Sequence, residues 1–491
     1  MSHLVESRRY GSQPGVGLTA RRLHDSNGQH WTSPYAAKRV HLVGIGGCGM
    51  SGLAGVLLRC GAIVSGSDRC GFSAQLRLEE LGATIRIGHA PINVPGDCHL
   101  VVASAAVDPK LPELARARDL GVEIVSYARM LGRLMSLRSG IAIAGTHGKS
   151  TTTALTTFIL RQAKKDPTFV VGAQVKQLGG GSGVGDGPNF VAEACEFDRS
   201  FLNLSPKLAA ILNIEEDHLD YYRDIADITD AFRSFAARVP ADGKLIANGD
   251  DPEVVAAVDG LAVDIERFGR LPDSDWRAQN IRASSGCYRF DVSYRGSPFL
   301  EASLDHLPGA HQIGNALAAT ALAHHAGIEP ESIADGLRDF RGADRRMTLR
   351  ADAGGVLVFD DYGHHPTEIR ATLLALREAR PGRRLWVIFQ PHQHSRTRFL
   401  LDDFASSFEL ADRLLVPDIY FVRDSEAEQQ TVSSSHLVDR VRAHGTDAAY
   451  VPDHDQLIEH VMARVQPGDI VLTLGAGDVW KIADALVRRL S

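Results

Sequence analysis

Short apolar runs alternate with amphipathic stretches through most of the chain. The first run spans residues 38–44, and apolar side chains then recur at helical spacing between Met50 and Cys60. Strands that alternate with helices build βαβ units around a parallel sheet. We therefore predict a Rossmann-like N-terminal domain over residues 36–138. Its other expected strands are residues 62–65, 99–103 and 122–125.

The same alternation begins again near residue 139. A new apolar run spans residues 140–144, a hairpin-like stretch follows at 287–304, and a helical pattern ends the series at 312–326. The glycine-rich residues 179–187 are interpreted as a mobile loop. These features predict a central α/β domain over residues 139–344. Its other expected strands are residues 169–171, 190–192 and 208–212.

A third alternating series follows Arg346 and predicts a C-terminal, Rossmann-like α/β domain over residues 345–491. Residues 1–35 carry no apolar core, so we expect a flexible N-terminal extension there. The fold class is therefore α/β, with three domains in series. The strands expected in the third domain are residues 356–359, 385–389, 413–416 and 470–474.

Composition narrows the class of protein further. A chain of 491 residues is too long for one hydrophobic core, which agrees with several domains. The formal net charge of −7 gives no overall attraction for nucleic acid. The six cysteines lack zinc-ligand spacing, and no apolar run reaches the about 20 residues of a membrane span. We expect a cytoplasmic protein without a membrane or nucleic-acid partner; the oligomeric state stays open.

A glycine-rich turn follows the first predicted strand. Residues 44–49 fit the pattern GxGxxG between a strand and a helix, and Asp68 follows the next strand. Glycines let the backbone approach a pyrophosphate, and an acidic residue at this distance can bind a ribose hydroxyl. By itself the pattern indicates an NAD or FAD site, or a tight turn without a ligand.

A second phosphate-binding loop starts the central domain. Residues 145–151 follow a buried strand and begin a helix, although Ile143 stands where the usual GxxxxGK[ST] pattern has glycine. Backbone N–H groups in such a loop bind phosphates, Lys149 can reach the β and γ oxygens, and Ser150 can bind Mg²⁺. The loop predicts an ATP site in a P-loop ATPase-like domain, and two such loops predict two phosphorylated ligands.

Carboxylates and histidines follow the later strands. Glu193 and Glu196 end one strand, and residues 213–220 follow the next; both clusters suit a bound Mg²⁺. The third domain has similar polar clusters at residues 360–366 and 390–398, which suit a carboxylate and an amine. Each cluster taken singly is more often a helix cap, a solvated loop or a surface turn than a ligand site.

Four segments together resemble the Mur ligases, and in particular their alanine-adding members. The resemblance runs from about Lys38 to the C-terminus. The motifs match the family in their residues and also in their order along the chain. It implies that the first domain binds a UDP-sugar instead of NAD, the second ATP and the third an amino acid. The four segments are residues 44–54, 145–151, 213–220 and 360–368.

The resemblance also assigns roles to single residues. Those for the UDP-sugar are Gly44, Gly46, Gly47, Gly49, Asp68 and Ser104. Those for ATP are Gly145, Thr146, His147, Gly148, Lys149, Ser150, Thr151, Asn315 and Arg346. Mg²⁺ is assigned to Ser150, Glu193 and His218, and catalysis to Lys149, His218 and Asp361. The amino acid is assigned to Tyr362, His364, His365 and Arg396.

The implied reaction is the ATP-dependent joining of L-alanine to the lactyl carboxylate of UDP-N-acetylmuramate through an acyl phosphate, in peptidoglycan synthesis. Cys195, Gln312 and Gln393 depart from the family pattern, and strictness for alanine over glycine or serine stays open. Three alternatives stay open as well. They are a cell-wall recycling ligase that adds a peptide, an NAD-dependent dehydrogenase and a non-catalytic nucleotide switch.

Overall fold

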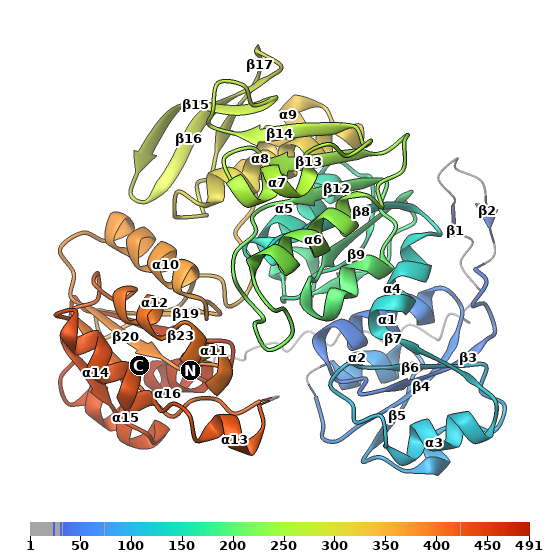
Figure 1. Ribbon diagram of the computed structural model, residues 1–491, viewed down its shortest axis with the longest axis horizontal. Helices are drawn as coiled ribbons and strands as arrows, with labels where there is room; N and C mark the ends of the chain where they lie inside the picture. The colour runs from blue at the N-terminus through green and yellow to red at the C-terminus, as the bar shows by residue number, and fades with distance from the viewer. Residues whose placement is uncertain (1–22, 25–29, 32, 73, 423) are drawn as a thin grey trace, which may run out of the picture.

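The computed structural model describes residues 23–24, 30–31, 33–72, 74–422 and 424–491. Most of the predicted N-terminal extension therefore lies outside the described residues. Within it, β1 (Leu23–His24) pairs antiparallel with β2 (His30–Trp31). Figure 1 shows the central domain at the top, between the N-terminal and the C-terminal domain.

The N-terminal domain has a five-stranded parallel sheet in the order β5-β4-β3-β6-β7. This is the strand order of one half of a Rossmann fold, because the third, second and first strands precede the fourth and fifth. Apolar side chains of β3 and β6 are buried, as their sequence pattern predicts. The strands are β3 (Arg39–Val43), β4 (Ile63–Asp68), β5 (Thr84–Ile87), β6 (Leu100–Ala103) and β7 (Glu123–Ser126). The helices are α1 (Cys48–Arg59), α2 (Gln75–Glu80), α3 (Pro112–Asp119), α4 (Tyr127–Met135) and the 3-10 turn η1 (Pro91–Asn93).

The central domain has a ten-stranded sheet in the order β10-β9-β11-β8-β12-β13-β14-β15-β16-β17. Strand β8 lies within this sheet and is buried on both faces, since alternate residues of a strand point to opposite sides. Ile141 and Ile143 pack with α5 and α8, whereas Ala142 and Ala144 belong to the core on the other side. The strands are β8 (Ser139–Ala144), β9 (Thr168–Val170), β10 (Ser182–Gly183), β11 (Asn189–Ala194), β12 (Leu208–Ile211), β13 (Lys244–Asn248), β14 (Ile265–Gly269), β15 (Trp276–Ser284), β16 (Cys287–Tyr294) and β17 (Ser297–Ser303).

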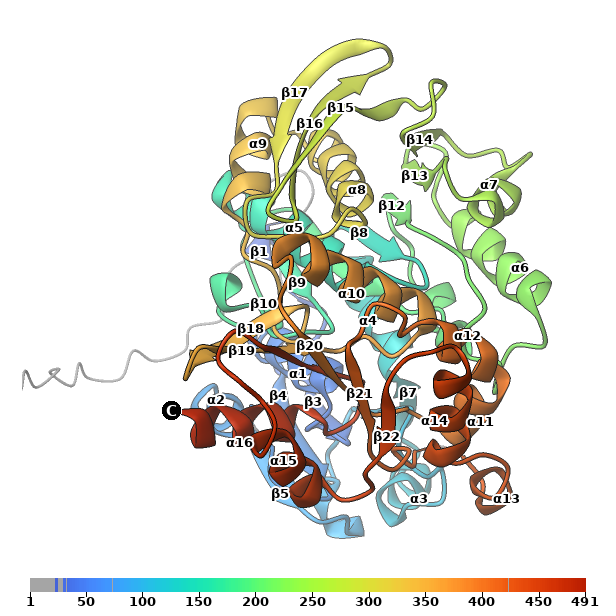
Figure 2. The same ribbon diagram turned by 90° about the vertical axis from the view of Figure 1, so that its left-hand side faces the viewer.

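Figure 2 shows the antiparallel strands β15, β16 and β17 projecting from one end of this sheet. The predicted hairpin at residues 287–304 is confirmed, with its turn at Arg295 and Gly296 between β16 and β17. Within the predicted loop 179–187, Ser182 and Gly183 form β10, which pairs with β9, and the mobility of the loop stays a prediction. The helices of the domain are α5 (Lys149–Gln162), α6 (Ile225–Ala236), α7 (Pro252–Val258), α8 (Gln312–His325), α9 (Pro330–Asp339), η2 (Lys176–Leu178) and η3 (Phe197–Asn203).

The C-terminal domain has a six-stranded sheet in the order β18-β19-β23-β20-β21-β22, in which only β18 runs antiparallel to its neighbour. The predicted α/β class with three sheet-containing domains is confirmed. The strands are β18 (Thr348–Ala353), β19 (Val356–Asp361), β20 (Leu385–Phe389), β21 (Arg413–Val416), β22 (Ala448–Tyr450) and β23 (Ile470–Leu474). The helices are α10 (Pro366–Ala379), α11 (His394–Phe399), α12 (Leu401–Ser406), α13 (Glu426–Gln429), α14 (Ser434–Ala443), α15 (His454–Met462) and α16 (Trp480–Leu490).

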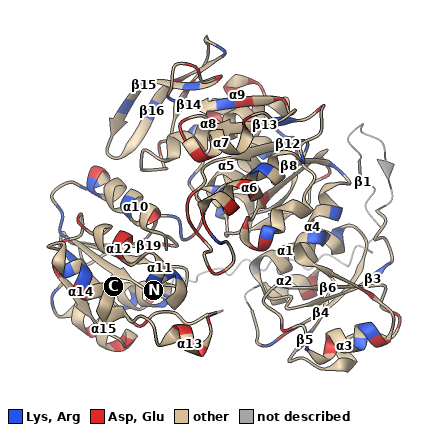
Figure 3. Cartoon of the chain, viewed as in Figure 1, with Lys and Arg blue, Asp and Glu red and all other residues tan. Residues whose placement is uncertain are grey.

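Basic and acidic residues are interspersed along the chain in all three domains in the view of Figure 3. Among the described residues, no helix is both long enough and apolar enough to cross a membrane. The N-terminal domain packs against the central one where α4 meets η3. There Gly132 comes so close to the carbonyl of Asn203 that a Cβ atom would lie 1.9 Å from its oxygen, so only glycine permits this contact.

Candidate active site

The loop between β8 and α5 has the backbone of a phosphate-binding loop. Helix α5 begins at Lys149, directly after Gly148, whose φ of 80° lies in the left-handed region. A Cβ atom on Gly148 would lie 2.5 Å from Oδ1 of Asn315, so a side chain is excluded on two grounds. The loop therefore points the first N–H groups of α5 toward the space beside it, where an anion binds favourably.

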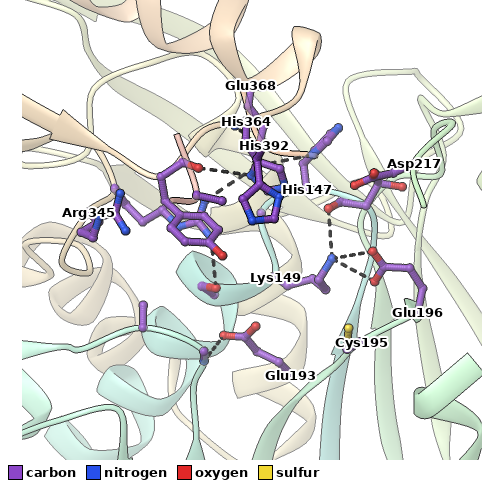
Figure 4. A pocket seen from close by; sticks show the side chains of 18 of the residues that line it. His147, Lys149, Glu193, Cys195, Glu196, Asp217, Arg345, His364, Glu368 and His392 are labelled. Atoms are coloured by element: carbon purple, nitrogen blue, oxygen red, sulfur yellow. Dashed lines mark hydrogen bonds and ion pairs between the residues drawn. The ribbon is translucent and has the colours of Figure 1, made fainter. Parts of the chain in front are cut away.

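Lys149 lies folded against this loop. Its Nζ atom donates to the carbonyl oxygens of Gly145 at 2.5 Å and Thr146 at 3.0 Å, and it lies 2.9 Å from Oε2 of Glu196. Figure 4 shows Lys149 pointing toward the Glu196 carboxylate. Burial alone would lower the pKa of Lys149, but the Glu196 carboxylate outweighs it, and the net pKa is raised. The ammonium is therefore charged and lies beside the loop, where it can meet a phosphate.

The three predicted metal ligands line one cavity of about 440 Å³ beside the loop. Ser150 Oγ accepts a bond of 3.4 Å from Arg346, and Glu193 accepts the backbone N–H of Gly172. The Nε2 atom of His218 lies 3.6 Å from Oε1 of Glu196. Its Nδ1 atom is buried and has no hydrogen-bond partner in the described part of the chain. A hydroxyl, a carboxylate and nearby acidic groups form a donor set that suits a hard cation.

Residues of the C-terminal domain close the same cavity. Tyr362, His364 and Arg396 line it, as does His392, while His365 is not among the described residues that do so. The aromatic ring of Tyr362 is flanked by two cations, because the guanidinium carbons of Arg345 and Arg346 lie 5.2 Å and 5.0 Å from its centroid. Cation–π contacts of this kind fix the ring at the junction of the two domains.

Arg396 is neutralised by a partner from the central domain. Its Nη2 and Nε atoms lie 2.6 Å and 3.0 Å from Oδ1 of Asp217, and both side chains are buried. Burial alone would raise the pKa of Asp217, but the Arg396 guanidinium holds it well below its usual range. In this arrangement Arg396 joins the two domains, and its charge is already matched before any substrate carboxylate arrives.

Asp361 occupies the junction between the domains. Its two carboxylate oxygens accept the backbone N–H groups of Met347 and Gly363, each at 2.6 Å. Burial raises the pKa of this carboxyl to about 6, although Arg346 opposes the shift. Asp361 lines a smaller cavity of about 160 Å³ on the other side of Arg346, together with Thr151 and Asn315. These contacts hold the hinge segment; the predicted catalytic role of Asp361 stays a prediction.

Two carboxylates that the sequence analysis did not single out stand at the centre of this junction. Glu368 accepts the backbone N–H of His364 at 2.9 Å and lies 3.5 Å from the Nδ1 atom of His147 (Figure 4). Glu215 accepts a bond of 2.5 Å from the hydroxyl of Thr367. Their positions in the sequence could have indicated both as site residues, because Glu368 lies in the first turn of α10 and Glu215 follows β12 beside the P-loop.

A further cavity of about 390 Å³ lies next to the P-loop and extends away from the C-terminal domain. Asn315 lines this cavity as well as the smaller one, and so connects both to Gly148. Its other lining includes Asn213, which belongs to the segment 213–220 that the sequence analysis associated with Mg²⁺, and Asn248, Phe268 and Arg270, which it had assigned to no ligand. An apolar ring with amides around it is the kind of surface that binds a purine base.

The glycine loop of the N-terminal domain lies at the carboxyl end of β3. Gly46 donates its N–H to Oδ2 of Asp68 at 2.8 Å, and a Cβ atom there would lie 2.7 Å from the ring of Phe72. Ser104 follows β6 at the same edge. A Cβ atom added to Gly44 would lie 3.0 Å from the Cβ atom of Ser104. The predicted UDP-sugar residues are thus together at one sheet edge, and Gly47 and Gly49 belong to the same loop. Asp68 supports the loop through Gly46.

A P-loop, a buried lysine–glutamate pair and a cavity closed by a third domain define a nucleotide-dependent enzyme of three α/β domains. The chain belongs to the Mur ligase family. Residues 39–139 match "Mur ligase family, catalytic domain", residues 143–323 match "Mur ligase middle domain", and residues 345–477 match "Mur ligase, glutamate ligase domain".

Relatives with established names are similar along almost their whole length. The UDP-N-acetylmuramate–L-alanine ligase of Caldanaerobacter subterraneus is 42% identical over 449 residues, which are 91% of this chain and 96% of that one. The enzyme of that name from Salinibacter ruber is 43% identical over 455 residues, 92% of this chain and 95% of that one.

Solved structures show the same arrangement. The UDP-N-acetylmuramate–alanine ligase of Thermotoga maritima superposes with a TM-score of 0.77 at 28% identity, covering 92% of this chain and 98% of that one. A murein peptide ligase from Psychrobacter arcticus superposes with a TM-score of 0.70 at 27% identity, covering 92% of this chain and 99% of that one.

Proposed function

We propose that this chain joins L-alanine to the lactyl carboxylate of UDP-N-acetylmuramate with the hydrolysis of ATP to ADP and phosphate. The observation that carries the proposal is the cavity that the P-loop residue Lys149 shares with Tyr362 and His364 of the C-terminal domain. Relatives about 42% identical over nine-tenths of the chain bear the name of this activity. The reaction is a step of peptidoglycan synthesis, on which cell-wall growth, cell shape and cell division depend.

A carboxylate and an amine do not condense in water unaided, so the carboxylate must first be activated. We infer that the lactyl carboxylate attacks the γ-phosphorus of ATP, which gives an acyl phosphate and ADP. The alanine amine then attacks the acyl carbon and phosphate leaves. Positioning and charge neutralisation provide most of the catalysis in such transfers. Lys149 and the N–H groups of the P-loop bring positive charge to the migrating phosphoryl group.

The ligand assignments are those that the resemblance implies, and the positions of the residues support them. ATP would take the P-loop residues 145–151, with its base near Asn315 and its phosphates beside Arg346. Ser150, Glu193 and His218 would hold Mg²⁺, which supplies charge neutralisation between the phosphates. The UDP-sugar would take the loop at residues 44–49 with Asp68 and Ser104. We further propose the domain limits 36–138, 139–344 and 345–491, and a cytoplasmic location where both nucleotides are available.

For the amino-acid site, we propose fewer residues than the sequence analysis assigned. Tyr362 and His364 line the cavity, so they are the residues we assign to alanine. Arg396 also lines it, but its charge is matched by Asp217. His365 lies outside the lining, and we assign it a different role below. Because reactive parts come from separate domains, their closure would keep water away from the acyl phosphate.

A second candidate is a ligase that adds a whole peptide, because a murein peptide ligase has nearly the same fold. The experiment that separates the two measures ADP release with UDP-N-acetylmuramate and a panel of amino acids and peptides. Turnover with L-alanine and none with a tripeptide supports the proposal. Turnover with the tripeptide alone would identify a peptide ligase. Reduction of NAD⁺ or oxidation of NADH without ADP release would contradict both proposals.

A further inference from the structure

Three side chains without a part in the proposed reaction converge between the central and C-terminal domains. His147 takes part in the P-loop through its backbone, and Nδ1 of its imidazole lies 3.5 Å from Oε1 of Glu368 in the C-terminal domain. Glu215 follows β12 of the central domain. His365 is the residue directly before α10 of the C-terminal domain. The ring centroids of the two histidines are 4.7 Å apart.

The spacing of their polar atoms is too wide for direct hydrogen bonds. Oε2 of Glu215 lies 3.5 Å from Nε2 of His147 and 3.8 Å from Nδ1 of His365. Charge-assisted hydrogen bonds are about 2.7–2.9 Å long. A tetrahedral ion with bonds of about 2.0–2.2 Å separates its neighbouring ligand atoms by roughly 3.3–3.6 Å. The distance from Glu215 to His147 falls in this range, and the distance from Glu215 to His365 is slightly longer. All three ligand atoms lie within 4.8 Å of one another, so small side-chain movements would let them surround an ion.

The second nitrogen of each imidazole faces an acceptor, at an ion-pair distance for His147 and at a hydrogen-bond distance for His365. Nδ1 of His147 faces Oε1 of Glu368 at 3.5 Å, and Nε2 of His365 donates to the carbonyl oxygen of Glu216 at 3.0 Å. Metal-binding histidines characteristically give their other N–H to a carboxylate or a carbonyl, which fixes the tautomer and the ring. The nitrogens that remain for an ion are therefore Nε2 of His147 and Nδ1 of His365.

The surroundings of these atoms fit the same conclusion. Nε2 of His147 is buried and has no hydrogen-bond partner among the residues that the structure describes. Nδ1 of His365 accepts only a long bond of 3.3 Å from the N–H of Thr367, which an ion would replace. The hydroxyl of Thr367 donates to Oε2 of Glu215 at 2.5 Å and so holds the third ligand in place.

We propose that His147, Glu215 and His365 bind a divalent transition-metal ion of the Zn²⁺ or Co²⁺ class. Two imidazoles and one carboxylate suit such an ion and leave a fourth position open, whereas Mg²⁺ prefers oxygen ligands throughout. The set shares no residue with Ser150, Glu193 and His218. An ion here replaces the proton on His147 and ties the C-terminal domain to the P-loop, so it stabilises the closed arrangement of the two domains.

The test is a titration of Co²⁺ into the full-length protein without nucleotide, followed by visible absorption. Four-coordinate Co²⁺ gives strong ligand-field bands, and Zn²⁺ should abolish them by displacement. His365→Ala and Glu215→Gln should each weaken Co²⁺ binding by more than about tenfold. His306→Ala, which removes an exposed histidine, and Glu193→Gln, which alters the proposed Mg²⁺ site, should leave these bands unchanged.

The proposal is overturned if the wild type gives no bands with Co²⁺ in large excess, or if the bands survive in both His365→Ala and Glu215→Gln. It is also overturned if they depend on Glu193 instead. Circular dichroism establishes folding of each variant, and Glu215→Asp, which keeps the charge but shortens the reach, replaces Glu215→Gln if that variant does not fold. No step measures ligation, so the result is independent of the proposed function.

Discussion

Nζ of Lys149 lies 2.9 Å from Oε2 of Glu196, and the two side chains are largely buried at the floor of the cavity. Burial raises the pKa of a carboxyl, but the ammonium of Lys149 overcomes this effect and lowers the pKa of Glu196. Each charge thus keeps the other ionised in the absence of ligand. A phosphate entering the loop would compete with Glu196 for Lys149, so this pair sets the lysine beside the path of the phosphoryl group.

Lys149→Ala removes the cation that we expect to meet the migrating phosphoryl group. The turnover rate of ADP release should fall by about 10²-fold or more. Lys165→Ala, which removes an exposed lysine just after α5, is the matched control and should keep the wild-type rate. Near-normal turnover in a folded Lys149→Ala variant would exclude this lysine from phosphoryl transfer.

The proposed metal ligands predict a change in the Mg²⁺ requirement. Glu193→Gln removes a charged oxygen and His218→Ala removes an imidazole that lies 3.6 Å from Glu196. Each variant should need more Mg²⁺ for half-maximal activity, by about tenfold or more, because the ion loses a ligand. The measurement is ADP release across a Mg²⁺ titration. Superimposable curves for wild type and both variants would place these residues outside the metal site.

Most of the strands that apolar runs predicted are buried parallel ones, although the mostly exposed β7 was predicted too and the buried β13 was missed. β8, β19, β20 and β23 are buried along most or all of their length, so burial dictates their composition. β5 and β18 were not predicted because most of their side chains are exposed or half-exposed, and their sequences show no apolar run. These edge strands are held by hydrogen bonds to a neighbouring strand. Such pairing leaves no signal in the local pattern of apolar and polar residues.

The site was predictable only where a motif lies on one continuous segment. The P-loop and the residues at the ends of β11 and β12 could be found because parallel strands place their carboxyl ends at one edge. The pairing of Asp217 with Arg396 and the approach of Glu368 to His147 join different domains. Local sequence does not determine how two domains dock, so these partners emerged only from the structure.

The two glycine loops should be separable by substitution. Gly46→Val places its side chain against Phe72 and Asp68 in the N-terminal domain, and should weaken binding of UDP-N-acetylmuramate by about tenfold or more. Gly148→Val strains a left-handed position and collides with Asn315, and should weaken ATP binding instead. Calorimetry with both ligands measures each variant, and circular dichroism establishes folding. Loss of both ligands in both folded variants would contradict separate sites.

A buried carboxylate outside the site should make the central domain sensitive to acid. Glu266 is fully buried and accepts bonds of 2.7 Å from Trp276, 2.8 Å from Tyr294 and 2.7 Å from His325. Burial alone would raise the pKa of Glu266, but these donors outweigh it and hold the pKa below the ordinary 4.5. The network therefore stabilises the fold above about pH 4.5, and this contribution is lost as the pH falls through the lowered pKa.

Glu266→Gln keeps the size of the side chain but removes the charge that these donors share. At neutral pH it should lower the free energy of unfolding by about 3 kcal/mol, because a buried network loses its common acceptor. The difference from wild type should shrink progressively below about pH 4.5, since Glu266 of the unfolded wild-type chain then takes up a proton, while the folded carboxylate stays ionised until the pH reaches its lowered pKa. Urea unfolding followed by tryptophan fluorescence measures both effects, with Glu301→Gln on the exposed edge strand β17 as the neutral control. A difference that stays constant down to strongly acid pH would show that the charge of Glu266 does not stabilise the domain.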